Sequence, residues 1–251
     1  MNAIISSNAK TPNKNLVQAT REKGEGNIEW LRRNLPAGNG VNLVLLGGTD
    51  QISFRLRAAQ AEVRHDLRPS HWSHVLLLKD IARGKGKLPD PDQIANAGTY
   101  EISLDPPRGF GFPAPTNGLQ EGKFGAYKYR SKFPNIAVLN VPVPMKEIEE
   151  ALEKFQFQRV VLDAVELLGV WLMYAWGVSR VTNPLVDSRG IPSAAMLEVV
   201  FGAAGYDLTP GIESRSSCPE AIWQAAKWWH EYYESQNRGV LTGSFSVTHD
   251  L

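Results

Sequence analysis

The chain has 251 residues, of which 43% are hydrophobic and 21% charged, so it suits one large folded domain or two small ones and excludes extensive disorder. Lys and Arg total 27 against 26 for Asp and Glu, which excludes nucleic-acid binding through bulk positive charge, and we expect no nucleic-acid partner. The single cysteine, Cys218, excludes an internal disulfide and multi-cysteine metal sites, and it favours a reducing, cytoplasmic compartment.

Polar residues dominate positions 1–26, which predict a flexible N-terminal arm without the apolar core of a signal peptide. The elements expected next are a helix at 27–35, a buried strand at 41–46, a helix at 52–63, a strand at 72–79, a loop at 83–92 and a strand at 99–104. Gly47 and Gly48 end the first strand, and Thr49 or Asp50 can cap the helix that follows. This half of the chain thus supplies most of the expected strands.

The second half of the chain is mostly helical by pattern. Its expected elements are an irregular loop at 108–125, a strand at 136–141, helices at 145–155, 160–176, 192–202 and from 219 onward, and a tail at 241–251. The most apolar stretch, 167–178, is about a dozen residues long, where a membrane span needs roughly 20, so we expect a buried helix and no transmembrane segment. Strands in the middle with helices before and after predict a single α+β domain over 27–240.

Two histidines precede an apolar run in the segment SHWSHVLLL. His74 stands where the predicted strand begins, so its ring can reach a cleft beyond the strand end and serve as a general base. The alternative is a surface or half-buried histidine that is hydrogen-bonded to a neighbour. His71 and His74, three residues apart, can also bind a metal, but no third ligand lies nearby in a recognisable pattern. We therefore expect neither a metal nor a cofactor.

Glu101 lies in the next predicted strand, in the segment TYEIS. If the two strands pair antiparallel, its carboxylate can reach the far nitrogen of His74 and determine which ring nitrogen carries the proton. We then expect a carboxylate oxygen of Glu101 within hydrogen-bonding reach of the imidazole. The alternative is a carboxylate that faces outward from the strand.

Two helix starts carry candidate nucleophiles. Cys218 lies in SSCPE, where a helix N-terminus lowers the pKa of a thiol and favours the thiolate. Ser193 lies in IPSAA, at an earlier helix start, and its oxygen can serve the same geometry. The structural alternatives are a helix cap or a small buried residue for Cys218 and an N-cap for Ser193.

The order of these residues, with a histidine on an early strand, an acid on the next strand and a nucleophile at a later helix start, resembles the circularly permuted branch of the NlpC-type papain-like hydrolases. That branch contains YiiX-like proteins and lecithin:retinol acyltransferase-like enzymes. Ser73-His74-Val75 matches its histidine step, Glu101 is the natural third residue, and the turn from Gly205 to Pro210 resembles the turn that follows the nucleophile helix. The register of that turn places Ser193, not a cysteine, at the nucleophile position, whereas Cys218 is the better nucleophile chemically.

The resemblance implies a permuted papain-like fold, with a small antiparallel sheet or barrel packed against helices. It also implies a cytoplasmic, bacterial-type hydrolase or acyltransferase that acts on an amide, peptide or lipid-acyl bond. His74 would be the base, Glu101 its orienting residue, and Ser193 or Cys218 the nucleophile. The first alternative is a catalytically inactive binding module for a peptide or lipid ligand, and the second is a protein that binds phosphate or anionic lipid through the basic loop 83–87.

Overall fold

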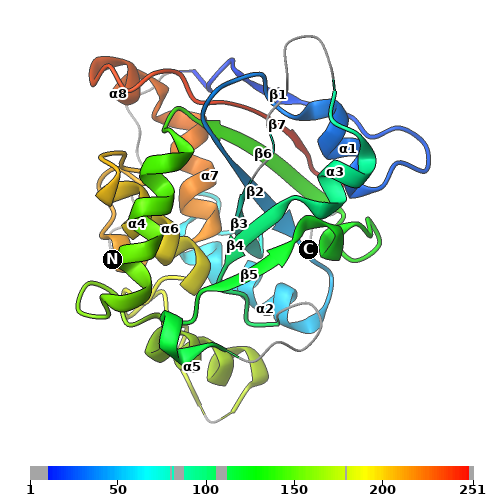
Figure 1. Ribbon diagram of the computed structural model, residues 1–251. Helices are drawn as coiled ribbons and strands as arrows, with labels where there is room; N and C mark the ends of the chain where they lie inside the picture. Colours follow the sequence, from blue (N-terminus) through cyan, green and yellow to red (C-terminus); the bar gives the residue numbers. More distant parts are fainter. Residues whose placement is uncertain (1–10, 80, 82–87, 106–111, 179, 249–251) are drawn as a thin grey trace.

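In the part of the chain that the structure describes, seven strands form one open sheet in the order β1-β7-β6-β2-β3-β4-β5 (Figure 1). The structure is a computed structural model, and it describes residues 11–79, 81, 88–105, 112–178 and 180–248. The strands are β1 (Leu16–Gln18), β2 (Val41–Gly47), β3 (His74–Leu78), β4 (Gly98–Glu101), β5 (Gln120–Lys123), β6 (Asn135–Val141) and β7 (Thr242–Ser246). β1 pairs parallel with β7 and every other pair is antiparallel. The α+β class is therefore confirmed, and the sheet is not closed into a barrel.

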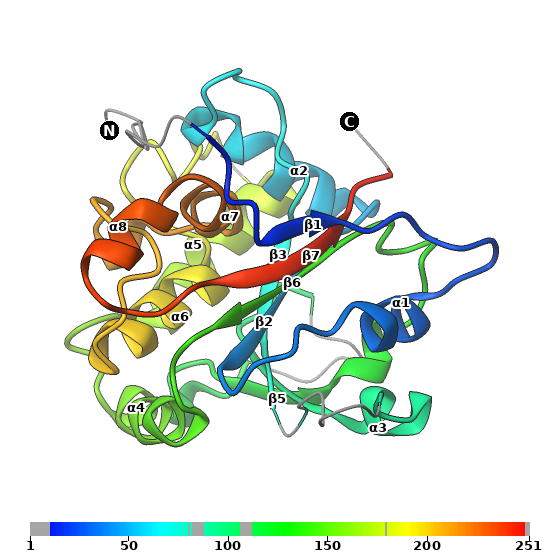
Figure 2. The same ribbon diagram turned by 90° about the horizontal axis from the view of Figure 1, so that it is seen from above.

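Helices pack on both faces of the sheet, with α1 and α3 on one side and α4 to α7 on the other (Figure 2). The α-helices are α1 (Asn27–Asn34), α2 (Gln51–Ala59), α3 (Pro91–Asn96), α4 (Met145–Phe157), α5 (Ala164–Trp176), α6 (Pro192–Ala203), α7 (Pro219–Trp228) and α8 (His230–Ser235). The short 3-10 helices are η1 (Gln60–Val63), η2 (Ala114–Thr116), η3 (Phe124–Tyr127) and η4 (Ser214–Ser216). None of the described helices is long and apolar enough to cross a membrane.

The central strands are buried on both faces, which explains why their sequences are continuous apolar runs rather than alternating ones. On β3, Val75 and Leu77 belong to the larger core, which also contains the buried side of α6. Leu76 and Leu78 belong to the smaller core against α1 and η3. Because side chains alternate along a strand, His74 points to the same side as Leu76, away from α6.

Both segments expected at the chain ends contribute a strand to the sheet. Strand β1 lies in the predicted arm at 1–26 and pairs with β7, which lies in the predicted tail at 241–251. Asn13 is also buried, and its amide donates to the carbonyls of Ala226 and Leu241. A polar composition predicted a loose arm, but partners more than 200 positions away satisfy these polar groups. Residues 1–10 and 249–251 lie outside the described residues.

Several element boundaries also differ from the sequence-based expectation. The helix expected from 160 begins at Ala164, because the Asp163 side chain caps it by accepting the amides of Val165 and Glu166. The region expected as an irregular loop at 108–125 contains β5, which pairs with β4. The basic loop at 83–87 lies outside the described residues.

Candidate active site

His74 and Glu101 are hydrogen-bonded to each other at the ends of neighbouring strands. His74 begins β3, Glu101 ends β4, and Nε2 of the imidazole lies 2.5 Å from Oε2 of the carboxylate. Glu101 is 3% exposed, so the outward-facing alternative does not hold. The expected contact between these two residues is therefore confirmed. The antiparallel pairing of β3 with β4 brings them together, although they are 27 positions apart.

Two further hydroxyl groups hold the Glu101 carboxylate. The phenol of Tyr127 donates to Oε2, and the hydroxyl of Thr99 donates to Oε1 over 3.2 Å. The ring of Tyr127 also stacks on the imidazole of His74, with 5.9 Å between the ring centroids. Burial and the nearby carboxylates of Glu101 and Asp105 raise the pKa of Tyr127 well above its usual value, so the phenol stays protonated as a donor.

This network indicates which ring nitrogen of the neutral His74 imidazole carries the proton. An ionised Glu101 can only accept hydrogen bonds, so the nitrogen facing it, Nε2 of His74, carries the ring proton. The other nitrogen, Nδ1, then carries a lone pair and has no hydrogen-bond partner among the described residues. A histidine oriented in this way by a buried carboxylate has the arrangement of a general base.

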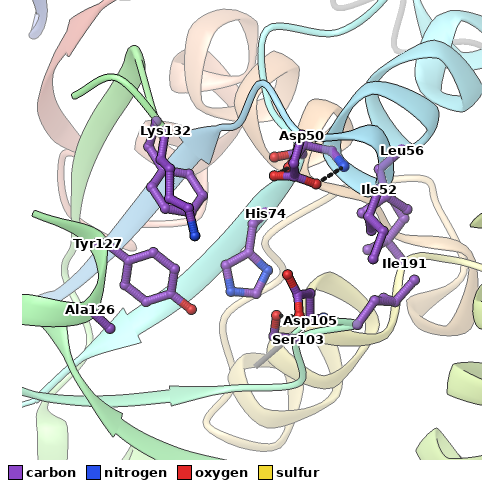
Figure 3. Close-up of a pocket in the computed structure, with 14 residues that line it drawn as sticks. Asp50, Ile52, Leu56, His74, Ser103, Asp105, Ala126, Tyr127, Lys132 and Ile191 are labelled. Atoms are coloured by element: carbon purple, nitrogen blue, oxygen red, sulfur yellow. Dashed lines mark hydrogen bonds between the residues drawn. The ribbon is translucent and has the colours of Figure 1, made fainter. Parts of the chain in front are cut away.

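A cavity of about 240 Å³ lies beside the imidazole (Figure 3). Figure 3 shows Asp50, Asp105, Lys132 and Tyr127 around the ring of His74. The polar side chains that line the cavity with His74 and Tyr127 are those of Asp50, Ser53, Ser73, Ser103, Asp105 and Lys132. The apolar ones are those of Ile52, Leu56, Leu104, Ala126, Phe133 and Ile191. The cavity thus offers an imidazole, two carboxyl groups, a lysine, several hydroxyls and an apolar wall to a ligand.

Helix α2 begins at this cavity. Asp50 caps it by accepting the amide of Ser53 at 2.9 Å and the hydroxyl of Ser53 at 2.8 Å. Gly48 lets the backbone pass close to Ser53 where the chain leads into α2, since an added Cβ would lie 2.2 Å from the Ser53 hydroxyl oxygen. The N-terminal end of α2 at the cavity wall is therefore already capped by the Asp50 carboxylate.

Ser193, the second residue of α6, is fully buried and does not line the cavity. Its hydroxyl donates to the carbonyl of Val75 over 2.5 Å and accepts the amide of Ile102 over 3.4 Å. Helix α6 packs on the face of β3 that carries Val75, whereas His74 points to the other face. The structure therefore does not join Ser193 to the His74–Glu101 pair, although Ile191 two positions earlier lines the cavity.

Cys218 precedes α7 as its N-cap residue and is also fully buried outside the cavity lining. Burial raises the pKa of its thiol to about 12, outweighing the backbone amides of the helix start that favour the thiolate. The helix terminus predicted an activated thiol, but loss of hydration dominates because α7 is packed in the core. Neither candidate nucleophile therefore lies beside the histidine.

The sequence analysis missed several residues of the cavity: Asp105, Ser103, Tyr127 and Lys132. Ser103 had a usable signal, because it follows Glu101 by two positions and strand alternation places the two on one face. No sequence signal pointed to Tyr127 or Lys132, since they reach the site from a segment that follows β5.

Within the described residues, no group of three or more His, Cys, Asp and Glu side chains is arranged to hold a metal ion. No protein-family model matches the chain, and comparison with curated proteins and with solved structures gives no significant match.

Proposed function

We propose that the chain is an acyl hydrolase or acyltransferase in which His74 is the general base and Glu101 orients it. The observation that carries the proposal is the 2.5 Å contact between Nε2 of His74 and the buried carboxylate of Glu101, with Nδ1 left for the cavity. The substrate class is an amide, peptide or lipid-acyl bond. Membership of the permuted NlpC-type papain-like group, with a cytoplasmic and bacterial setting, is part of the same proposal and rests on the sequence motifs.

The mechanism follows from the charges around the imidazole. Nδ1 of His74 takes a proton from the attacking hydroxyl, and the resulting imidazolium is stabilised by the carboxylate of Glu101. Lys132 lines the cavity, where its ammonium group can stabilise a developing oxyanion, whereas the first-turn amide of Ser53 in α2 is already bonded to the Asp50 carboxylate. These groups supply both proton transfer and charge stabilisation for acyl transfer.

The size of the cavity favours a small acyl group. A volume of about 240 Å³ is below the roughly 300 to 1,000 Å³ of sites that enclose a drug-sized ligand. Ile52, Leu56 and Ile191 provide an apolar wall for a short chain. The remainder of a larger substrate would lie outside.

The test is hydrolysis of p-nitrophenyl acetate, butyrate and octanoate together with N-acetyl amino-acid amides. We expect His74→Ala to lower kcat/KM by about 10² to 10⁴-fold, the usual contribution of a positioned general base. The matched control is His65→Ala, because His65 is exposed and does not line the cavity. Equal hydrolysis by the wild type and His74→Ala would exclude the proposal.

A second candidate is a binding module without covalent catalysis, which recognises a peptide or lipid ligand. The burial of Ser193 and Cys218 away from the cavity favours it. It predicts no hydrolysis above that of His74→Ala, together with a ligand-induced rise in Tm that His74→Ala removes and His65→Ala retains. The same two variants therefore distinguish the two candidates.

A further inference from the structure

Three serines line the cavity beside His74, and they differ in what their hydroxyl protons do. Ser73 donates its proton to the carbonyl of Leu46 over 3.2 Å. Ser53 donates to a carboxylate oxygen of Asp50 over 2.8 Å. The oxygen of Ser103 accepts the amide of Asp105 over 3.2 Å, and its own proton has no acceptor among the described residues. Of the three, Ser103 alone has a proton available to a base.

Ser103 lines the same cavity as His74 and follows the strand that carries Glu101. β3 and β4 pair through Leu78–Thr99 and Leu77–Tyr100, and Ser103 lies two positions beyond the end of β4, on the cavity wall that His74 also lines. Ser103 also lies two positions after Glu101 and therefore on the same face. Since Nε2 of His74 is occupied by Glu101, the nitrogen left for Ser103 is Nδ1.

The backbone at Ser103 is held in place, as a nucleophile requires. Its amide donates to Oε1 of Gln120 over 3.2 Å, and its carbonyl accepts from Nε2 of the same side chain over 3.1 Å. Gln120 belongs to β5 and is 7% exposed, so this pair of bonds joins Ser103 to the edge of the sheet. The backbone at Ser103, in the connection that follows β4, is thus bonded to β5 through both its amide and its carbonyl.

We propose that Ser103 is the nucleophile and that Ser103, His74 and Glu101 form the catalytic triad of this protein. The inference rests on the acyl-hydrolase function proposed above. The Ser103 oxygen bonds to the acyl carbon of an ester or amide while its proton passes to Nδ1 of His74. The bond to the alcohol or amine then breaks, and the leaving group takes that proton. Water hydrolyses the acyl-serine through the same base, which releases the acid and restores the hydroxyl.

The primary experiment is labelling with a fluorophosphonate probe followed by mass spectrometry of the labelled peptide. Attack by the serine oxygen on phosphorus expels fluoride, so the stable adduct marks the nucleophile. We expect the adduct on Ser103, its loss in Ser103→Ala and in His74→Ala, and a fall in kcat of about 10³-fold or more in Ser103→Ala. The control is Ser235→Ala, because Ser235 is exposed on α8 and should leave labelling unchanged.

A second variant separates a chemical role of Ser103 from a structural one. Ser103→Cys keeps the size of the side chain, and its thiol should react with iodoacetamide at least about tenfold faster than the same thiol combined with His74→Ala, since the histidine promotes the thiolate. Cys218 gives little background because it is buried.

The outcomes distinguish the proposed role of Ser103 as nucleophile from the proposed acyl-hydrolase function. Hydrolysis that needs His74 but persists in Ser103→Ala would overturn the nucleophile and leave the acyl-hydrolase function standing. No hydrolysis, no adduct and no effect of His74 on the Ser103→Cys thiol would overturn both.

Discussion

The hydroxyl of Ser193 bridges the backbones of two strands, donating to the Val75 carbonyl over 2.5 Å and accepting from the Ile102 amide over 3.4 Å. The amide of Lys79 bonds to the carbonyl of Gly98, and counting along the antiparallel ladder makes Val75 and Ile102 another hydrogen-bonded pair. The Ser193 side chain thus takes the place of a direct backbone bond, immediately beside His74 and Glu101. The Ser193 side chain therefore helps to hold together the two strands that carry His74 and Glu101.

Ser193→Ala should therefore lower the stability of the fold. The change leaves a buried carbonyl and a buried amide without their partner, so the free energy of unfolding should fall by about 1 to 3 kcal/mol. Urea denaturation followed by tryptophan fluorescence measures it. If Ser193 were instead the nucleophile, the same variant would lose all hydrolysis at unchanged stability.

The thiol of Cys218 should be unreactive in the folded protein. Burial raises its pKa to about 12, and the residue has no exposed surface. At pH 8 the thiolate fraction alone predicts iodoacetamide alkylation about 10³-fold slower than for a free thiol, since each pKa unit changes that fraction tenfold. The rate in guanidinium chloride is the control. Rapid alkylation of the native protein below pH 8, accompanied by loss of hydrolysis, would restore Cys218 as the nucleophile.

The buried carboxyl of Glu198 should cause the free energy of unfolding to fall as pH rises. Glu198 is 3% exposed, and burial beside Asp207 raises the pKa of its carboxyl from 4.5 to about 8. Between these values the folded chain holds a proton that the unfolded chain releases, so stability falls across this range by up to about 1.4 kcal/mol per pH unit.

The Glu198→Gln variant isolates that effect. Its amide oxygen can still accept the backbone amides of Leu208 and Thr209, as Oε1 of the glutamate does at 3.1 and 3.4 Å. Urea midpoints at pH 5, 6, 7 and 8 should therefore show a flatter dependence than the wild type. An unchanged dependence would show that another group titrates.

Glu101 should act through the orientation of His74. In Glu101→Gln the amide can face Nε2 as donor or acceptor, so the ring proton is no longer assigned to one nitrogen, and kcat/KM should fall by about 10² to 10⁴-fold. The ¹⁵N chemical shifts of the His74 ring should show the Nε2–H form in the wild type and a mixture in the variant.

Tyr127→Phe provides the matched comparison for Glu101. It removes one donor to the carboxylate but keeps the ring that stacks on His74, so the Nε2–H form should persist with a smaller loss of activity. A variant of Glu101 with wild-type ring shifts and wild-type hydrolysis would contradict the orienting role.

The sequence by itself predicted the features that depend on neighbours along the chain. The apolar run beginning at Val41 defined a buried strand, and Pro219 marked the start of α7. Strand order and the polar positions at strand ends also predicted the contact between His74 and Glu101. These properties follow from backbone sterics, hydrophobic periodicity and the adjacency of consecutive strands, which short segments already contain.

Only the tertiary structure decided which faces of the helices and strands pack together and which side chains are removed from water. β1 pairs with β7 from the other end of the chain, and α6 packs on the side of β3 that His74 does not occupy. That packing made Ser193 a bridge between strands, while burial deprived Cys218 of the hydration that a thiolate needs. The helix-start motifs predicted a nucleophile at both Ser193 and Cys218 because a helix N-terminus is a suitable backbone setting for a nucleophile. Access to the base depends instead on contacts among residues more than 100 positions apart, which no local pattern encodes.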